Sequence, residues 1–217
     1  MFKKNKNYIL TISDFSEIRL EESKECKIIK REVISDEIIY NGKILDELQL
    51  SYLLNKFLSD VDVSDNLLIR NSYSKNLFRI KKVEGITEKD LDGYIKYNLD
   101  ELLPFSKEHI AIEPQIKDEY ITIFGMDKEF IGFIENFIEE MGFNKVFLTM
   151  FPSEFITFWK NSQVRDFVFL NIENSFYEYF FIKNGDFKEY NIIPTNDLKL
   201  DEGALPDDFQ KNQMRNV

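Results

Sequence analysis

The chain has 217 residues, of which 43% are hydrophobic and 31% are charged, a composition typical of a globular protein of one or two small domains. Its formal net charge of −11 argues against non-specific binding to nucleic acid or anionic lipid, because phosphate groups would repel it. The single cysteine, Cys26, excludes an internal disulfide and fits a reducing cytoplasm, and the single histidine, His109, argues against a histidine-based metal site. No segment approaches the roughly 20 apolar residues of a membrane span, and no signal-peptide pattern opens the chain.

The first third of the chain is predicted to form a β-meander, a hairpin, a helix and a further strand. Asn41-Gly42 is a strong signal for the hairpin turn. Apolar residues at helical spacing predict one buried helix face, made of Leu50, Leu53, Leu54, Phe57 and Leu58. The predicted elements are strands 8–12, 17–22 and 26–34, the hairpin 37–46, the helix 46–58 and the strand 66–71.

The middle third is predicted to contain two helices separated by a hairpin. Thr87 can cap the first helix together with Asp90, and Pro104 disfavours helix at the residue before it. Gly142 follows the second helix, where a left-handed cap favours glycine. The predicted apolar face of that helix consists of Phe130, Ile131, Ile134, Phe137, Ile138 and Met141. The predicted elements are the strand 76–83, the helix 87–105, the hairpin strands 109–116 and 119–125, and the helix 127–145.

The last third is predicted to form a strand at 145–150, a helix at 152–161 and a second three-stranded meander that ends near Pro194. Asn184-Gly185 predicts a hairpin turn within this meander. Its middle strand carries aromatic residues on both faces, which indicates either burial on two sides or one open face that is an interface. The residues after Pro194 are polar and without periodicity, which predicts a tail or linker.

This order of elements predicts one α/β unit that is interrupted by an inserted subdomain and followed by the start of a second unit. The two meanders, 8–34 and 167–193, are interpreted as an internal duplication. The predicted division is residues 1–75 with 148–164 for the first subdomain, 76–147 for the insertion, 165–195 for the second meander and 196–217 for the tail or linker.

Four stretches resemble PilM-like actin-fold proteins of the type IV pilus inner-membrane platform, with the GspL cytoplasmic domain of type II secretion as a close relative. They are residues 40–58, 90–116 with the Pro-Phe pair at the helix end, 120–143 and 167–193. The resemblance implies an α/β fold of the actin-like, RNase H-like class. It would comprise a first lobe with an inserted small α/β subdomain and the opening β-meander of a second RNase H-like unit.

The resemblance also implies two phosphate-binding loops, and the chain departs from both. Ser13 and Phe15 stand where the family's first loop has an aspartate and a glycine, and Asn171 and Glu173 depart from the Asp-x-Gly pattern of the second. Without glycine the backbone N–H groups cannot approach a phosphate, and a phenylalanine would fill its place. We therefore expect a degenerate nucleotide site with no cofactor and no enzymatic activity.

Three acidic residues, Asp14, Glu17 and Glu173, lie in or beside these loops and would add Coulomb repulsion toward a nucleotide. Their oxygens could also form a site for a hard metal ion, but charged turn residues are the ordinary interpretation, so no metal is predicted. His109 is interpreted as a surface or strand-edge residue, and Cys26 as an ordinary strand position.

In the family that the chain resembles, the inserted subdomain and its groove hold a short peptide from a membrane partner. On this ground Leu103, Pro104 and Phe105 are the candidate partner-binding residues; the alternative is a helix terminator with a buried phenylalanine. The implied function is a non-catalytic adaptor at the cytoplasmic face of the inner membrane. Its partners would be a PilN-like bitopic protein, through which it would reach the membrane, and the assembly ATPase.

Two other interpretations stay open. The chain could be the N-terminal half of an active actin-fold ATPase or kinase with unusual phosphate loops, or an unrelated α/β interaction domain. The choice between pilus and secretion apparatus is also open. If the chain is GspL-like, the residues after Pro194 would lead to a transmembrane helix beyond Val217.

Overall fold

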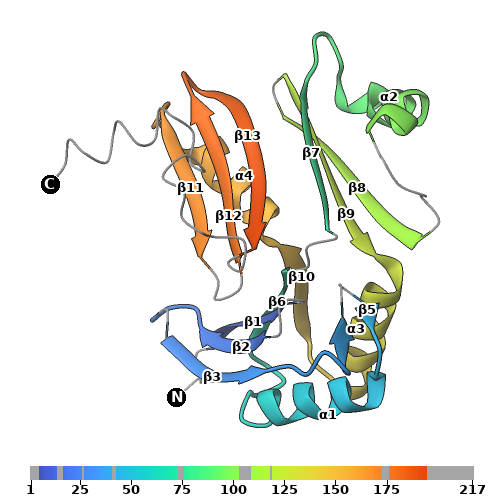
Figure 1. Ribbon diagram of the computed structural model, residues 1–217, viewed down its shortest axis with the longest axis vertical. Coiled ribbons are helices and arrows are strands. Elements are labelled where there is room, and N and C mark those ends of the chain that lie inside the picture. The colour runs from blue at the N-terminus through green and yellow to red at the C-terminus, as the bar shows by residue number, and fades with distance from the viewer. Residues whose placement is uncertain are drawn as a thin grey trace, which may run out of the picture. The chain divides into compact units, whose positions relative to one another are not determined.

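The computed structural model describes residues 5–13, 17–25, 27–40, 43–72, 76–102, 109–117, 119–172 and 176–194. The chain divides into two compact units, Met1–Gln163 and Val164–Val217 (Figure 1). Each unit is described by itself. Among the described helices, none has the length and apolar character that a membrane span requires.

The first unit is built around a five-stranded mixed sheet with the strand order β10-β6-β1-β2-β3. The first three strands form the predicted antiparallel meander, and β6 and β10 run parallel to β1. The sequence prediction of all five strands is therefore confirmed. Their bounds are β1 (Asn7–Ser13), β2 (Glu17–Glu22), β3 (Lys27–Val33), β6 (Asn66–Ser72) and β10 (Lys145–Met150).

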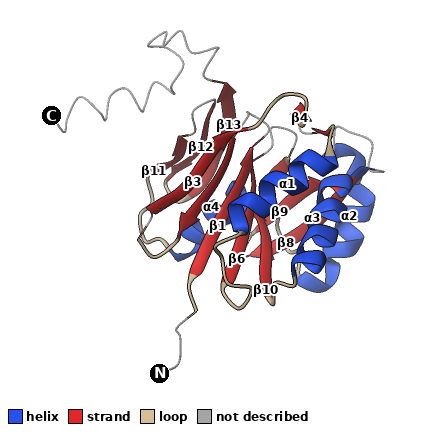
Figure 2. Cartoon of the chain, turned by 90° about the horizontal axis from the view of Figure 1, so that it is seen from below, coloured by secondary structure: helices blue, strands red, loops and turns tan. Residues whose placement is uncertain are grey.

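Helices cover both faces of this sheet. Figures 1 and 2 show α1 (Glu47–Leu58) and α3 (Lys128–Met141) on one face and α4 (Phe151–Asn161) on the other. Helix α1 begins after Asp46, whose carboxylate accepts a hydrogen bond from the Gln49 N–H. The five residues predicted for its buried face are all buried. A short hairpin precedes α1, with β4 (Ile39–Tyr40) and β5 (Lys43–Ile44).

Between β6 and β10, the chain forms a second, three-stranded sheet with the order β7-β9-β8. Helix α2 packs on one face of this sheet through Leu91 and Ile95, which contact Leu77, Ile121 and Ile123. Helix α2 ends two residues before Pro104, as the sequence predicts. The elements are β7 (Leu77–Lys82), α2 (Glu88–Leu102), β8 (Ile110–Lys117) and β9 (Tyr120–Asp127).

Helix α3 follows β9 directly, and the predicted cap at Gly142 is confirmed, so the helix ends at Met141 and not at residue 145. Asp127 caps its first turn, and Gly142 ends it with a φ of 72°. The buried stripe is shifted from the predicted one: Phe133 is buried, whereas Ile131, Ile138 and Met141 are only half-buried. The residues that the helix buries are Phe130, Phe133, Ile134 and Phe137, which follow the i, i+3, i+4, i+7 spacing of a single helix face.

Gly132 lies in the interior of α3, and a Cβ atom built on it would meet nothing within 4 Å. Glycine in a helix interior costs about 1 kcal/mol relative to alanine. We therefore expect Gly132→Ala to raise the free energy of unfolding by up to about 1 kcal/mol, measured by urea denaturation. Gly93 in α2 has the same free space, so Gly93→Ala is the matched second test. A loss of stability in both variants would contradict this description of the helices.

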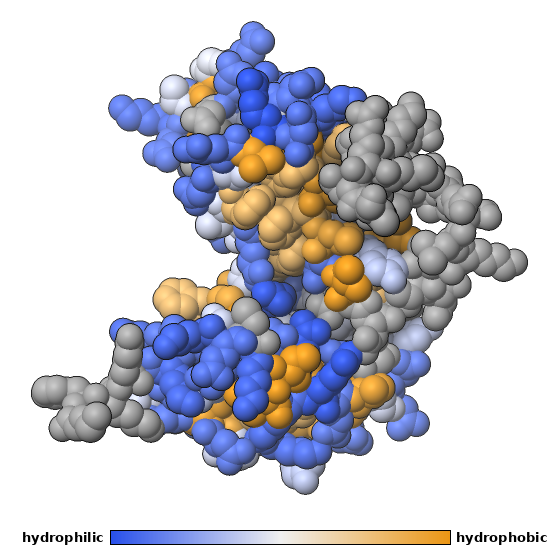
Figure 3. Space-filling view, turned by 90° about the vertical axis from the view of Figure 1, so that its left-hand side faces the viewer, coloured by the Kyte–Doolittle hydropathy of each residue, from blue (hydrophilic) through white to orange (hydrophobic). Residues whose placement is uncertain are grey.

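Strand β3 forms one edge of the five-stranded sheet and exposes the apolar residues Ile28, Ile29 and Val33. Strand β3 lies at the left of the first unit in Figure 1, the side that faces the viewer in Figure 3. There, hydrophobic residues (orange) are interspersed with hydrophilic ones (blue). Charged residues on an edge strand hinder pairing with another chain. Lys30 also ties the edge to α1, because its Nζ donates to the Lys56 carbonyl oxygen at 2.8 Å.

The second unit contains a three-stranded antiparallel meander with the order β11-β12-β13. The Asn184-Gly185 turn has φ angles of 57° and 81°, the left-handed values that a two-residue hairpin turn requires. Like the first meander, this one has a register shift between its second and third strands. The strands are β11 (Phe167–Ile172), β12 (Phe176–Lys183) and β13 (Asp186–Pro194).

The middle strand of this meander, β12, buries one face and has Tyr179 buried on the other, where Tyr177 and Phe181 are half-buried. Phe176 and Phe180 are buried on one face and Tyr179 on the other. The Tyr179 hydroxyl donates to a Glu189 carboxylate oxygen at 2.7 Å. Burial and this hydrogen bond raise the pKa of the Tyr179 phenol to about 12.

This shift has a consequence for stability at high pH. Because the pKa of Tyr179 is higher in the folded chain than in the unfolded chain, its contribution is fully present below pH 10 and is lost as the pH rises toward 12. We expect the free energy of unfolding to fall over that interval, and Tyr179→Phe to remove part of the fall. Phe181→Leu, on the same strand, changes a side chain that does not titrate; it is the control and should leave the fall in place. An unchanged pH dependence in Tyr179→Phe would contradict the assignment.

Candidate functional site

The parallel strands β1, β6 and β10 end together at one edge of the first sheet, where open α/β sheets bind their ligands. At this edge Ser13, Asn71 and Ser72 are buried polar residues. The Asn76 side-chain amide donates to the carbonyl oxygen and to the side-chain oxygen of Asn71 at 3.2 and 3.1 Å. Hydrogen bonds within the chain therefore satisfy some of the polar groups at this edge.

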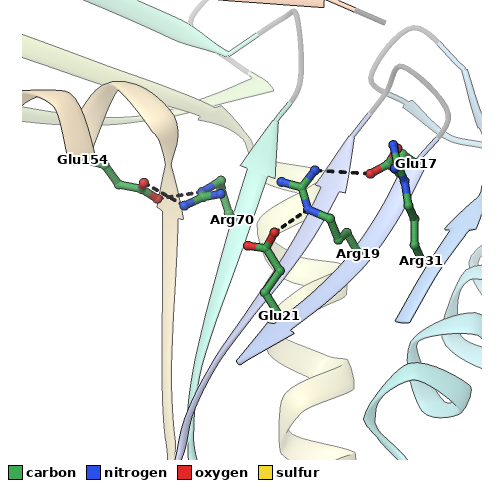
Figure 4. A network of polar contacts seen from close by, with 6 residues as sticks. All are labelled: Glu17, Arg19, Glu21, Arg31, Arg70 and Glu154. Atoms are coloured by element: carbon green, nitrogen blue, oxygen red, sulfur yellow. Dashed lines mark hydrogen bonds and ion pairs between the residues drawn. The ribbon is translucent and has the colours of Figure 1, made fainter. Parts of the chain in front are cut away.

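Of the residues expected in the first phosphate loop, Ser13 is buried at the end of β1, whereas Asp14 and Phe15 lie outside the described residues. Glu17 begins β2, and its carboxylate pairs with Arg31 at 2.6 Å and with Arg19 at 3.4 Å (Figure 4). Because two arginines neutralise Glu17, it does not present the unopposed negative charge that the sequence suggested. Its oxygens are engaged by these arginines, which disfavours a role as a metal ligand.

Of the residues expected in the second loop, Asn171 lies in β11 and Glu173 lies outside the described residues. The Asn171 side-chain amide donates to a carboxylate oxygen of Glu178 at 3.4 Å, and the Tyr190 hydroxyl donates to the other oxygen at 2.8 Å. Glu178 is only 4% exposed. Asn171 thus helps to satisfy a buried carboxylate in the second unit.

The remaining sequence candidates do not form a site in the described part of the chain. Leu103, Pro104, Phe105 and Cys26 lie outside the described residues. His109 is exposed, one residue before β8. Within the described ranges, no group of three or more His, Cys, Asp or Glu residues is placed to hold a metal ion.

A groove of about 360 Å³ lies in the first unit between the inserted sheet and β10. One wall is the face of β8 and β9 opposite to α2. On β8, Ile112 and Ile116 pack toward the cluster under α2, and the groove is lined by Ala111, Glu113 and Gln115 together with Ile112. On β9, the groove is lined by Phe124, Gly125 and Met126.

The other wall consists of Leu148, Thr149 and Met150 at the carboxyl end of β10, together with Ser153 in the first turn of α4. Ile131 of α3 completes the lining. Strand β8 is the edge of its sheet and β10 is the edge of the five-stranded sheet, so two strand edges flank the groove. Edge strands carry backbone N–H and C=O groups that an added strand can pair with.

Among the described residues of the lining, most are apolar and Glu113 is the only charged one. The Gln115 side-chain amide donates to a Glu113 carboxylate oxygen at 2.9 Å. A second carboxylate, that of Glu154, follows Ser153 in α4, but Arg70 of β6 binds it through two hydrogen bonds of 2.7 and 2.8 Å (Figure 4). The groove therefore combines apolar walls with one negatively charged side chain.

The sequence prediction placed partner binding in the inserted subdomain but did not identify this groove. The only local signal is the alternation in 110–116, where isoleucine on one face alternates with Ala111, Glu113 and Gln115 on the other. That pattern is typical of any strand with a solvent-facing side. The second wall comes from β10, which begins 28 residues after the end of β8.

The first unit is a β-meander followed by two parallel strands, with an α/β insertion before the last strand, and the next unit holds a second meander. A chain with this order of elements has an actin-like α/β fold. This confirms the fold class expected from the sequence. The groove lies between the insertion and the last strand of the first sheet.

Three solved structures with this fold are similar to the chain. The EpsL cytoplasmic domain, from an inner-membrane component of the type II secretion system of Vibrio cholerae, has 8% identity and a TM-score of 0.57, with 89% of this chain and 73% of that one covered. A chain in the PilM–PilN type IV pilus biogenesis complex has 11% identity and a TM-score of 0.62, with 85% and 60% covered. A Bacteroides thetaiotaomicron protein with an actin-like ATPase fold and unknown function has 13% identity and a TM-score of 0.52, with 88% and 70% covered.

At 8–13% identity these similarities establish the fold and no more. In sequence, the chain matches no protein-family model and no curated protein.

Proposed function

We propose that the chain is a non-catalytic adaptor in the assembly platform of a type IV pilus or a type II secretion system. In this proposal it binds, in the groove between β8 and β10, the cytoplasmic tail of a bitopic inner-membrane protein of the PilN type. The chain would thereby be held at the cytoplasmic face of the membrane, where the assembly ATPase would be a second partner.

The observation that carries the proposal is the groove itself, which has apolar residues on both walls beside polar ones and is flanked by two edge strands. Such a groove suits an extended peptide, because backbone pairing supplies affinity and the apolar lining accepts alternate side chains. The fold supports the same conclusion, since the similar structures include a component of a secretion system and a complex between PilM and PilN.

A non-catalytic role is supported by the sequence of the phosphate loops, which lack the glycines that phosphate binding requires. A calorimetric titration with Mg-ATP should show no saturable binding. Saturable binding that disappears when Asn171 and Glu173 are replaced would contradict the proposal and favour an actin-fold ATPase or kinase.

The partner is tested by affinity capture of the tagged protein from detergent-solubilised membranes, followed by mass spectrometry. We expect to recover a bitopic platform protein with the wild-type chain. Thr149→Trp, which would fill the groove with an indole ring, should lose it. Glu84→Lys, an exposed change in the inserted subdomain outside the groove, is the control and should retain it.

A further inference from the structure

Among the described residues that line the groove, Glu113 alone is charged, and its carboxylate bears on what can bind there. Glu113 projects from the middle of β8, opposite Phe124 of β9 and between Ala111 and Gln115 on the groove face. Among the described residues, no lysine or arginine forms an ion pair with Glu113. Its carboxylate accepts a hydrogen bond from the neutral side-chain amide of Gln115.

A carboxylate has about four lone-pair positions, so one amide hydrogen bond leaves most of its accepting capacity unused. In the structure Glu113 is exposed, so water can donate hydrogen bonds to the remaining lone pairs of its carboxylate. A peptide that covered the groove would remove this water, and an unpaired charge would then be buried against Phe124 and Met126 at a large cost in free energy.

From these observations we infer that the groove selects a peptide that carries a lysine or arginine between apolar side chains, and that Glu113 is the residue that selects it. The inference rests on the groove of the proposed function and specifies the chemistry of the peptide. A cationic side chain would pair with Glu113 in surroundings where charge-assisted hydrogen bonds are strong. An acidic side chain at the same position would be rejected by like-charge repulsion.

Of the lining residues that the structure describes, Glu113 is the one that can make this selection. The nearby carboxylate of Glu154 is already held by Arg70 in a two-point ion pair. The hydroxyl groups of Thr149 and Ser153 are neutral and can accept or donate, so they do not distinguish a basic from an acidic peptide. The preference of the groove for a basic over an acidic peptide therefore depends on Glu113.

The test is to pan a phage-displayed library of random peptides against the full chain and against three variants. Peptides selected by the wild-type chain are expected to be enriched in lysine and arginine at one position flanked by apolar residues. Glu113→Lys should select aspartate and glutamate at that position, and Glu113→Gln should show little preference. Glu84→Lys, the matched charge reversal outside the groove, should select the same peptides as the wild-type chain.

The size of the Glu113 effect is measured as the affinity for the peptide that the wild-type chain enriches most. By fluorescence anisotropy, Glu113→Lys should weaken binding by about tenfold or more, the factor expected when a charge-assisted hydrogen bond is lost. Thr149→Trp should abolish binding, which places the peptide in the groove. Peptides that depend on Thr149 but show no charge preference and no response at Glu113 would overturn this inference and leave the groove assignment intact. Peptides that bind regardless of Thr149, or no selected peptides at all, would overturn both.

Discussion

Gly125→Ala is expected to lower the free energy of unfolding by about 1–3 kcal/mol, the cost of forcing an extra carbon into a packed core. Gly125 lies in β9, the middle strand of the inserted sheet. A Cβ built on it would lie 2.8 Å from Ile110 Cγ2 and 2.9 Å from Leu77 Cβ, closer than real Cβ contacts. Strands β7 and β8 would therefore have to move apart.

The measurement is urea denaturation of the full chain, with Gly132→Ala as the matched control. The two variants make the same chemical change but should have opposite signs, because Gly132 has free space and Gly125 has none. Since β8 also carries Glu113, Gly125→Ala should weaken peptide binding as well. Equal stability of Gly125→Ala and the wild-type chain would show that the inserted sheet is not packed as described.

Arg70→Met is expected to lower the free energy of unfolding by about 2 kcal/mol, because it removes two hydrogen bonds to a carboxylate and leaves that carboxylate without its cation. The exposed fractions of the two side chains are 12% for Arg70 and 29% for Glu154, so water screens the pair only in part. The pair joins β6 to the first turn of α4, next to the groove residue Ser153.

A double-mutant cycle with Glu154→Gln separates the pair from its surroundings. We expect the two changes together to cost less than the sum of the single changes, because the neutral amide no longer needs the arginine. Lys82→Met, which removes an exposed ion pair with Glu119, is the control and should cost less than about 1 kcal/mol. Additive costs at Arg70 and Glu154 would contradict the coupling.

Most of the fold could be predicted from the sequence because its elements carry local signals. The alternation in β1 and β2, the helical spacing from Leu50 to Leu58 and the two Asn-Gly turns are short-range patterns, and the strands and the helix that they predict are present. Helix boundaries could also be predicted, because capping residues are local signals. The Thr87 hydroxyl and backbone N–H donate to the Asp90 carboxylate at 2.6 and 3.1 Å, and these two hydrogen bonds lower the pKa of Asp90.

The groove could not be predicted because it forms only when distant segments meet. Its walls come from β8 and β9 on one side and from β10 and α4 on the other. Arg70 and Glu154 are 84 residues apart, and Lys30 reaches the end of α1 across 26 residues, so no local pattern indicates either contact. The partner-binding role predicted for Leu103, Pro104 and Phe105 stays a prediction, because these residues lie outside the described ranges.

The most direct test of the adaptor proposal is site-specific photo-crosslinking in cells. A photoreactive amino acid with a compact alkyl diazirine, which is much smaller than an indole ring and leaves the groove open, is placed at Thr149, inside the groove, and in a second strain at Glu84, outside it. If the groove holds the tail of a membrane protein, the Thr149 position should crosslink to the cytoplasmic tail of a bitopic inner-membrane protein and the Glu84 position should not. Crosslinks from Thr149 that match those from Glu84, or that reach only soluble proteins, would contradict the adaptor function.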